Sequence, residues 1–147
     1  MRILIGVLFF CAAACMLGQN LPIREGLWEN TVLDDDGSVA MRSLSCVTRR
    51  SIADMIVKAN NHPGCRVSGQ NISSHSITVD ISCSRPRVQT SAHSLMELLD
   101  PEHCRATTTM RMTINGKSSE STSKSTCRFV KSDCGSIKPD NPEITSQ

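Results

Sequence analysis

The side chains best suited to chemistry in this chain are eight cysteines, four histidines and a run of three aspartates. Two of the cysteines, Cys11 and Cys15, belong to an apolar segment at the start of the chain. The sequence contains no Cys-x-x-Cys pair, so it lacks the ligand spacing of common zinc sites. The six cysteines that follow the apolar segment are Cys46, Cys65, Cys83, Cys104, Cys127 and Cys134.

The first residues predict that the chain is exported. Residues 1–19 combine a positive charge at Arg2, an apolar run and small residues, which is typical of a signal peptide and too short for a good membrane span. We expect a periplasmic or secreted protein. The stretch Ala-Ala-Ala-Cys that ends at Cys15 resembles a degenerate lipobox, so a lipoprotein anchored to the membrane through Cys15 is the alternative. An even number of cysteines outside the cytoplasm indicates a disulfide framework.

Turn chemistry suggests how the six cysteines pair. Asn115-Gly116 is a strong signal for a two-residue hairpin turn, and this turn places Cys104 directly opposite Cys127. A second hairpin centred on Ser74 places Cys65 opposite Cys83. Cys46 and Cys134 then pair by elimination, which gives three disulfides.

The histidines and serines show no arrangement typical of catalysis. His62, His75 and His103 lie in expected turns, and we expect His93 to face the interior opposite Met110 as a polar wall residue. The serines of residues 117–125 lack a Gly-x-Ser-x-Gly motif and a partnered histidine.

The acidic run does not complete a metal site. Asp34, Asp35 and Asp36 supply three side chains in one turn, whereas calcium takes six or more oxygen ligands. The sequence therefore predicts no catalytic, cofactor or metal site.

Strands are expected along most of the chain. Two strands flank the turn at 34–37 and pair so that Glu29 lies opposite Arg42 and Val32 opposite Val39. Residues 88–99 form either a strand, which we favour, or a short helix. We expect residues 20–135 to form one β-rich domain and residues 136–147 a disordered tail.

One helix is expected at about residues 51–59, where the period of the apolar residues changes. Ser51 and Asp54 resemble a capping box, and Pro63-Gly64 follows the end of the helix. The apolar residues at helical spacing are Ile52, Met55, Ile56 and Ala59.

The last ribbon bears on both fold and function. In the expected pairing, Met110 and Met112 share a face with serines of the opposite strand, and these serines cannot fill a dry core. The strand is therefore an edge strand or the wall of a hydrated cavity. These serines are Ser119, Ser121, Ser123 and Ser125.

Consecutive strands joined by short turns predict a mainly β protein. The expected fold is an antiparallel meander curled into a barrel or half-barrel, with one inserted helix and three disulfides. A two-sheet β-sandwich is the alternative. Trp28 is expected in the core with Val32, Val39 and Met41, and a ligand platform is its alternative role.

The Gly-Leu-Trp-Glu stretch and the order of the cysteines resemble exported bacterial proteins grouped as domain of unknown function 3617. The resemblance covers about residues 21–135. It implies an exported β-rich protein and carries no established activity, ligand or catalytic residue. Ser132 stands where the family has glycine, and Cys104 and Cys127 are additions to the pattern. The matching residues are Gly26, Leu27, Trp28, Glu29, Cys46, Thr48, Cys65, Cys83 and Cys134.

We expect a non-enzymatic binding protein. Its partner is a small apolar ligand or another envelope protein that docks along the serine-rich strand. A hydrolase-type enzyme of unknown substrate and a purely structural envelope component are the alternatives. The net charge of +2 is scattered, and the chain has three Phe, one Trp and no Tyr, so nucleic-acid binding is not expected. Residues that could line the cavity or edge are Trp28, His93, Met110, Met112, Ser119, Ser121 and Ser123.

Overall fold

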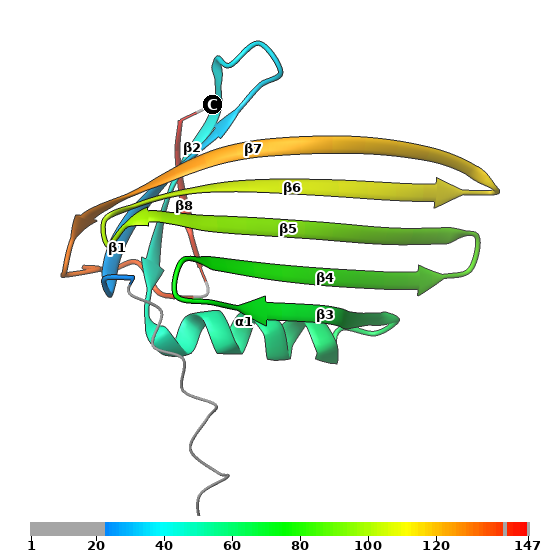
Figure 1. Cartoon of the computed structure of the whole chain (residues 1–147), viewed down its shortest axis with the longest axis horizontal. Helices are drawn as coiled ribbons and strands as arrows, with labels where there is room; N and C mark the ends of the chain where they lie inside the picture. Colours follow the sequence, from blue (N-terminus) through cyan, green and yellow to red (C-terminus); the bar gives the residue numbers. More distant parts are fainter. Residues whose placement is uncertain (1–22, 140, 147) are drawn as a thin grey trace, which may run out of the picture.

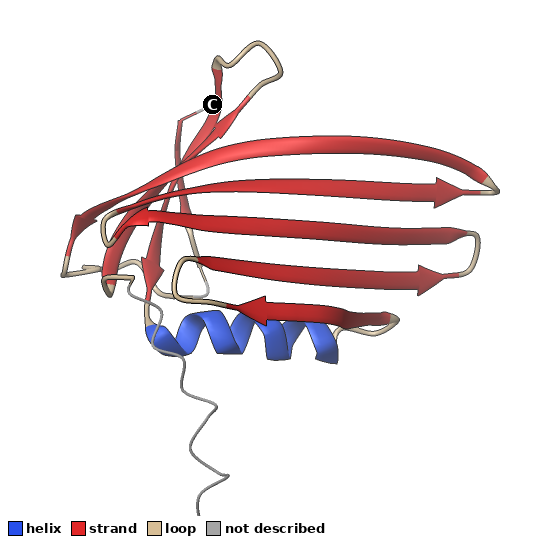
Figure 2. Ribbon diagram, in the orientation of Figure 1, coloured by secondary structure: helices blue, strands red, loops and turns tan. Residues whose placement is uncertain are grey.

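The computed structural model describes residues 23–139 and 141–146. The expected signal peptide (residues 1–19) and the lipidation candidate Cys15 lie outside these residues. Strands dominate the described part, and one helix lies at its margin (Figure 2). The elements are β1 (Gly26–Leu33), β2 (Val39–Val47), α1 (Arg49–Asn61), β3 (Cys65–Ile72), β4 (Ser76–Arg85), β5 (Val88–Asp100), β6 (His103–Ile114), β7 (Lys117–Lys131) and β8 (Glu143–Ser146).

The eight strands form one antiparallel sheet in the order β3-β4-β5-β6-β7-β1-β2-β8. β3 to β6 run side by side, whereas β1, β2 and β8 cross their direction steeply, and β7 joins the two parts (Figure 1). The sheet is curled but not closed, because β3 and β8 remain at its two edges. The predicted half-barrel meander with one helix is confirmed, and residues 88–99 are a strand as favoured.

A small core lies at the end of the sheet where β1 crosses β7. We call the sheet face that carries Trp28 and Leu98 the inner face, and the opposite one the outer face. Trp28 is only 1 % exposed. Its ring meets Phe129 edge-on at 5.8 Å between centroids, and its Nε1 donates a hydrogen bond to the Arg24 carbonyl oxygen at 2.9 Å. The core residues are Ile23, Trp28, Leu98 and Cys104, with Val47, Met96, Cys127 and Phe129 half-buried against them.

The core position of Trp28 is confirmed, but its expected neighbours are wrong. Trp28 pairs with Phe129 of β7, close to the start of β1, whereas Val32 lies towards the end of that strand. Val39, at the start of β2, is 43 % exposed. The core forms where β7 and β5 converge on the start of β1 and the end of β2, and the residues next to the β1–β2 turn contribute little to it.

All three expected disulfides are present. The Cα atoms are 5.0 Å apart in Cys104–Cys127, 4.0 Å in Cys65–Cys83 and 5.5 Å in Cys46–Cys134. The first two bridge neighbouring strands, and the third ties β2 to the segment after β7. The disulfides therefore connect the curled sheet at both its centre and its margin.

The ribbon of β6 and β7 keeps the expected register from the turn to the disulfide. Ile114 lies opposite Lys117, Cys104 lies opposite Cys127, and no irregularity interrupts the pairing. Asn115 and Gly116 adopt positive φ angles of 48° and 80°, as a type I′ turn requires.

The β3–β4 hairpin reaches the expected disulfide by a different path. Its turn is centred between Ser74 and His75, because the Ser73 N–H donates to the Ser76 carbonyl oxygen at 2.8 Å. A register shift between Val67 and Gly69 then restores the pairing of the two cysteines. The symmetric pairing about Ser74 is therefore wrong near the turn.

The expected register of β1 with β2 is also wrong. Glu29 lies opposite Leu44 rather than Arg42, and Val32 lies opposite Met41 rather than Val39.

The cause of this shift lies in the loop of residues 34–38 and next to it. The loop closes with the Asp34 N–H donating to the Ser38 carbonyl oxygen at 2.9 Å, and Gly37 has a φ of 84°. The register shifts again between Val32 and Leu33. The chain therefore places five residues, 34–38, between the paired strands, one more than the expected four at 34–37.

The helix is longer than expected and begins earlier. Thr48 is the N-cap, and its Oγ1 accepts a hydrogen bond from the Ser51 N–H at 3.0 Å. Ser51 Oγ accepts in return from the Thr48 N–H at 2.9 Å, so Ser51 closes the capping box rather than starting it. α1 contacts β3, and the Asn60 Oδ1 accepts from the Val67 N–H at 2.7 Å. The helix thus satisfies a backbone donor at this edge of the sheet.

The expectation of a disordered tail over residues 136–147 is wrong for residues 143–146. Glu143–Ser146 forms β8, which pairs antiparallel with β2. Its short ladder covers the open side of β2, and the preceding Cys46–Cys134 disulfide holds the tail close to that strand.

Cross-strand ion pairs on the outer face predict a pH-dependent stability. The hydrogen bond from Arg128 to Glu29 (2.8 Å) lowers the pKa of Glu29, and that from Arg105 to Glu97 (2.7 Å) lowers the pKa of Glu97. These carboxylates stabilise the fold above their ordinary pKa of 4.5, and the contribution is lost as the pH falls through the lower folded values.

We therefore expect the urea midpoint of unfolding to fall as the pH is lowered from about 5 to 3. A double variant, Glu29→Gln with Glu97→Gln, should show a shallower decline. An unchanged slope in this variant would contradict the assignment.

Candidate functional site

β7 carries an unpaired stretch of backbone. β6 pairs with β7 from Lys117 to Arg128, but β1 pairs with it only from Lys124 to Lys131. Residues 117–123, which we call the β7 free edge, therefore have a neighbouring strand on one side only. Every residue of this edge is exposed, and β7 extends well beyond β1 (Figure 1).

Successive residues of an antiparallel strand direct their backbone N–H and C=O groups to opposite sides, and this determines which groups of the β7 free edge have no hydrogen-bond partner in β6. The two-residue turn closes on a hydrogen-bonded pair, so Lys117 and every second residue after it direct their N–H and C=O groups to β6. Ser118, Glu120 and Thr122 consequently direct theirs away from β6. The structure thus offers a row of alternating donors and acceptors to one further strand.

The predicted serine face is confirmed, and it leaves apolar side chains uncovered. Ser121 lies opposite Met110, and Ser119 lies opposite Met112. Met110 is 39 % exposed, and Ile114 at the end of β6 is 46 % exposed. A serine side chain is too short to cover a methionine on the neighbouring strand.

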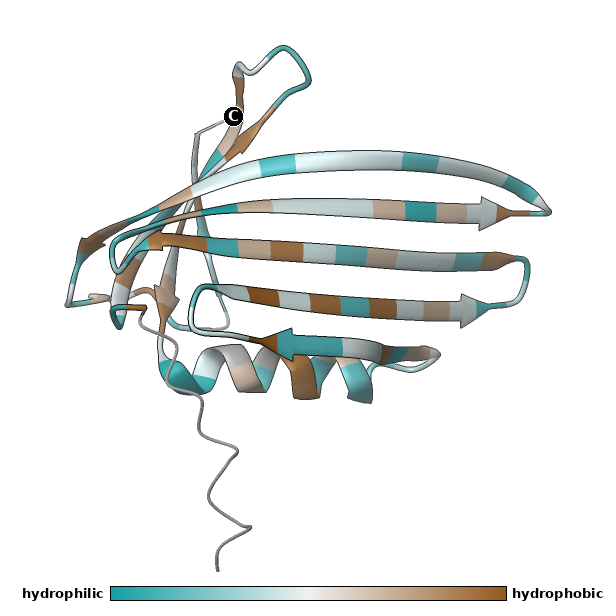
Figure 3. Ribbon diagram, viewed as in Figure 1, coloured by the Kyte–Doolittle hydropathy of each residue, from teal (hydrophilic) through white to brown (hydrophobic). Residues whose placement is uncertain are grey.

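The apolar character of the inner face continues from β6 to β3. Met110 lies opposite Ala92, Ala92 opposite Ile81, and Ile81 opposite Val67. Figure 3 shows the alternation of apolar and polar residues along β4. Ala92, Ile81 and Val67 are only partly buried, so an apolar row crosses the sheet in partial contact with solvent.

The expected position of His93 is wrong. His93 lies opposite Thr109 rather than Met110, and its Nδ1 is 2.6 Å from Asp80 Oδ1 on the outer face. The cause is a register shift between Leu98 and Asp100, which moves every later pair by one residue. A one-residue shift exchanges the two faces of a strand, so Ala92 takes the inner position opposite Met110.

The other three histidines lie in separate parts of the fold. His75 lies in the β3–β4 turn, and the His103 Nδ1 is 2.9 Å from Asp100 Oδ2. His62 caps the end of α1, next to the disulfide-bonded Cys65. Within the described residues, no three His, Cys, Asp or Glu side chains gather as a metal site. Among residues 23–139 and 141–146, no helix has the length and apolar character needed to cross a membrane.

The sequence profile of a family of proteins of unknown function, DUF3617, matches residues 23–134. The chain belongs to the DUF3617 family. No curated protein and no solved structure matches the sequence.

The DUF3617 motif residues have structural roles at the core end of the sheet. A Cβ on Gly26 would lie 2.3 Å from the Lys131 carbonyl oxygen, and Gly26 has a φ of 144°, so only glycine fits there. Trp28 fills the core, and Glu29 pairs with Arg128. Ser132 stands where the resemblance predicted glycine, and it is absent from the described residues with positive φ, so that position does not require glycine here.

Two features of the DUF3617 chain escaped the sequence reasoning. The open backbone groups belong to Ser118, Glu120 and Thr122, which alternate with the serines predicted to line the cavity or edge. The Asn115-Gly116 turn already determines which residues of the following strand direct their N–H and C=O groups away from β6, so the sequence could have identified these residues. The length of the β7 free edge could not be predicted from the sequence of the β6–β7 hairpin, because it depends on where the distant strand β1 ends its pairing with β7.

Proposed function

We propose that this protein binds an extended segment of another envelope protein as an added strand along the β7 free edge. The observation that supports this proposal is the mismatch in length between β7 and β1, which leaves residues 117–123 without a second neighbour. Strand addition to a free edge is a recurrent mode of peptide recognition, in which backbone hydrogen bonds supply affinity and alternate side chains supply specificity.

The inner face defines the chemistry of the partner. Partner side chains on that face stand beside Ser119, Ser121 and Ser123, which leave space above them. Large apolar side chains there would extend towards Met110 and Met112. On the outer face the partner meets Glu120 and Lys124, which favours polar side chains. The partner segment therefore alternates between apolar and polar residues.

The proposed role is non-enzymatic and lies outside the cytoplasm. The three disulfides support an oxidising compartment, where such bonds persist. No described histidine meets a serine together with an orienting carboxylate, which is the arrangement a hydrolase of this kind needs.

Proline at position 122 tests the proposal. Thr122→Pro removes an N–H that points away from β6, so the hydrogen bonds of the β6–β7 ladder remain. We expect the variant to bind a seven-residue peptide of alternating valine and threonine at least about tenfold more weakly. Peptide binding is measured by titration, and amide exchange should show protection of Ser118, Glu120 and Thr122 in the parent protein only.

Two controls make the test specific. Thr122→Ala keeps the N–H and removes only the side chain, whose Oγ1 lies 3.3 Å from the Thr109 Oγ1, so its peptide affinity should match the parent. Ser121→Pro interrupts the bonding to β6 and should lower the urea midpoint. Equal peptide binding by Thr122→Pro and the parent, or protection away from β7, would refute the proposal.

A small apolar ligand on the inner face is the second candidate. It is favoured by the partly exposed row of Met110, Ala92, Ile81 and Val67. Thr122→Pro separates the two candidates, because it blocks strand pairing and leaves this row unchanged. A ligand whose binding survives Thr122→Pro but weakens on Ile81→Ser would favour the second candidate.

A further inference from the structure

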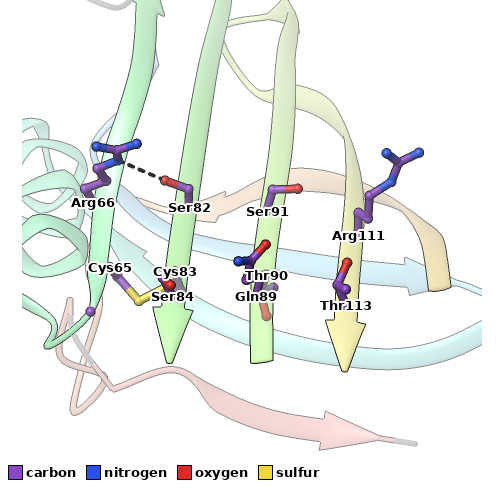
Figure 4. A pocket seen from close by; sticks show the side chains of 11 residues that line it. Cys65, Arg66, Ser82, Cys83, Ser84, Gln89, Thr90, Ser91, Arg111 and Thr113 are labelled. Carbon is purple, nitrogen blue, oxygen red and sulfur yellow. Dashed lines mark hydrogen bonds between the residues drawn. A yellow bond between two sulfur atoms is a disulfide. The ribbon is translucent and has the colours of Figure 1, made fainter. Parts of the chain in front are cut away.

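The outer face carries a depression at the end of the sheet away from Trp28. Its volume is about 600 Å³, and it spans β3 to β6. Figure 4 shows that the side chains of Arg66 and Arg111 lie on either side of Ser82 and Ser91. Further hydroxyl and amide groups of the lining come from Ser84, Gln89 and Thr113.

The pairing of four strands places this lining in register. Arg66 lies opposite Ser82, Ser82 opposite Ser91, and Ser91 opposite Arg111. Residues directly opposite one another in a sheet share a face, so two guanidinium groups flank two hydroxyl groups on the outer face. Arg66 Nε donates a hydrogen bond to Ser82 Oγ at 3.3 Å, which holds this guanidinium over the row.

The charge around the depression is positive. Arg87 lies in the β4–β5 turn at the same end of the sheet, and Arg85 ends β4 there, on the inner face by the same alternation. Within the described residues, neither of them nor Arg66 makes an ion pair. Two carboxylates lie nearby. Glu120 pairs with Arg111 at 3.2 Å, and Asp80, one outer-face position from Ser82, is held by His93.

The geometry points to a binding site for a phosphate-bearing ligand at this depression. Guanidinium groups bind phosphate oxygens with two parallel hydrogen bonds, and serine hydroxyls donate to the remaining oxygens. Three strand spacings separate Arg66 from Arg111, about 14 Å between Cα atoms. Two linked phosphate groups, or one phosphate reached by both long side chains, match this span.

Pyrophosphate is the probe for a soluble ligand. We expect saturable binding in calorimetric titration that weakens as salt is raised, and about tenfold weaker binding for each of Arg66→Gln and Arg111→Gln. Arg128→Gln is the matched control, because it removes an outer-face arginine at the opposite end of the sheet. Its pyrophosphate affinity should equal that of the parent protein.

Vesicles distinguish a lipid source from a soluble one. The same variants are sedimented with vesicles of phosphatidylcholine containing about 30 % phosphatidylglycerol, and with pure phosphatidylcholine. Binding to the anionic vesicles that is lost in Arg66→Gln assigns the site to a lipid headgroup, whereas pyrophosphate binding alone assigns it to a soluble phosphate.

Failure of both probes overturns the inference. So does an equal loss of binding in Arg128→Gln and Arg66→Gln, because general charge would then explain the attraction. The site lies on the opposite face from the uncovered methionines, so Thr122→Pro should leave phosphate binding intact. Failure of this inference is therefore distinguishable from failure of strand addition.

Discussion

Replacing Trp28 with alanine is expected to lower the free energy of unfolding by about 3 to 5 kcal/mol. The residue is the largest fully buried side chain among the described residues, and few other buried residues share its core. The variant loses the edge-on contact with Phe129 and leaves the Arg24 carbonyl oxygen without its indole donor. A domain of this size is typically stable by about 5 to 15 kcal/mol, so a large share of its stability is at risk.

Urea unfolding followed by circular dichroism measures this effect, because the variant removes the only tryptophan fluorophore. Trp28→Phe keeps a ring beside Phe129 and loses the N–H, so it should fall between the parent and Trp28→Ala. Leu99→Ala is the control, since Leu99 is 59 % exposed. Similar costs for Leu99→Ala and Trp28→Ala would show that the core lies elsewhere.

Removal of the Cys46–Cys134 disulfide is expected to cost more than removal of either hairpin disulfide. Its cysteines are 88 residues apart in sequence, against 18 for Cys65–Cys83 and 23 for Cys104–Cys127. A cross-link that closes a longer loop restricts the unfolded chain more, which gives about 4 to 5 kcal/mol for the long loop and about 3 kcal/mol for the short ones. The other two disulfides shorten the effective loop without changing this order.

Paired cysteine-to-alanine variants test the order under identical urea gradients. Cys46→Ala with Cys134→Ala should unfold at the lowest urea concentration, and amide exchange should accelerate in β8, which follows Cys134. Cys65→Ala with Cys83→Ala provides the comparison. A larger loss in the hairpin variant would mean that native packing around that bridge outweighs the restriction of the unfolded chain.

The cysteine pairing and the β6–β7 ribbon could be predicted because their causes are local. Asn115-Gly116 sets the turn, and twelve cross-strand pairs follow from it without interruption. Trp28 could be predicted as a core residue because it is the one aromatic side chain in the stretch Gly26–Leu33, which was expected to form a strand. Such features need only turn chemistry and the strand period of two.

The errors in strand pairing and in the position of His93 share one physical origin. Register shifts at Val32, Val67 and Leu98 each displace the pairing, and no residue type in the sequence marks them. One such shift moved His93 to the outer face. The pairing of β1 with β7, which defines the β7 free edge, joins segments about 100 residues apart. The arginines of the depression come from separate strands, so only the assembled sheet brings them together.

The two outermost strands of the sheet, β3 and β8, determine whether copies of the protein can assemble edge to edge. Asn60 of α1 occupies a backbone donor of β3, and β8 is only four residues long. Polymerisation into fibres needs two complementary edges on every subunit, and among the described residues the β7 free edge is the one edge that neither α1 nor β8 contacts. Copies of this chain therefore do not propagate into a fibre through β7, because a copy offers no second open edge that could pair with it.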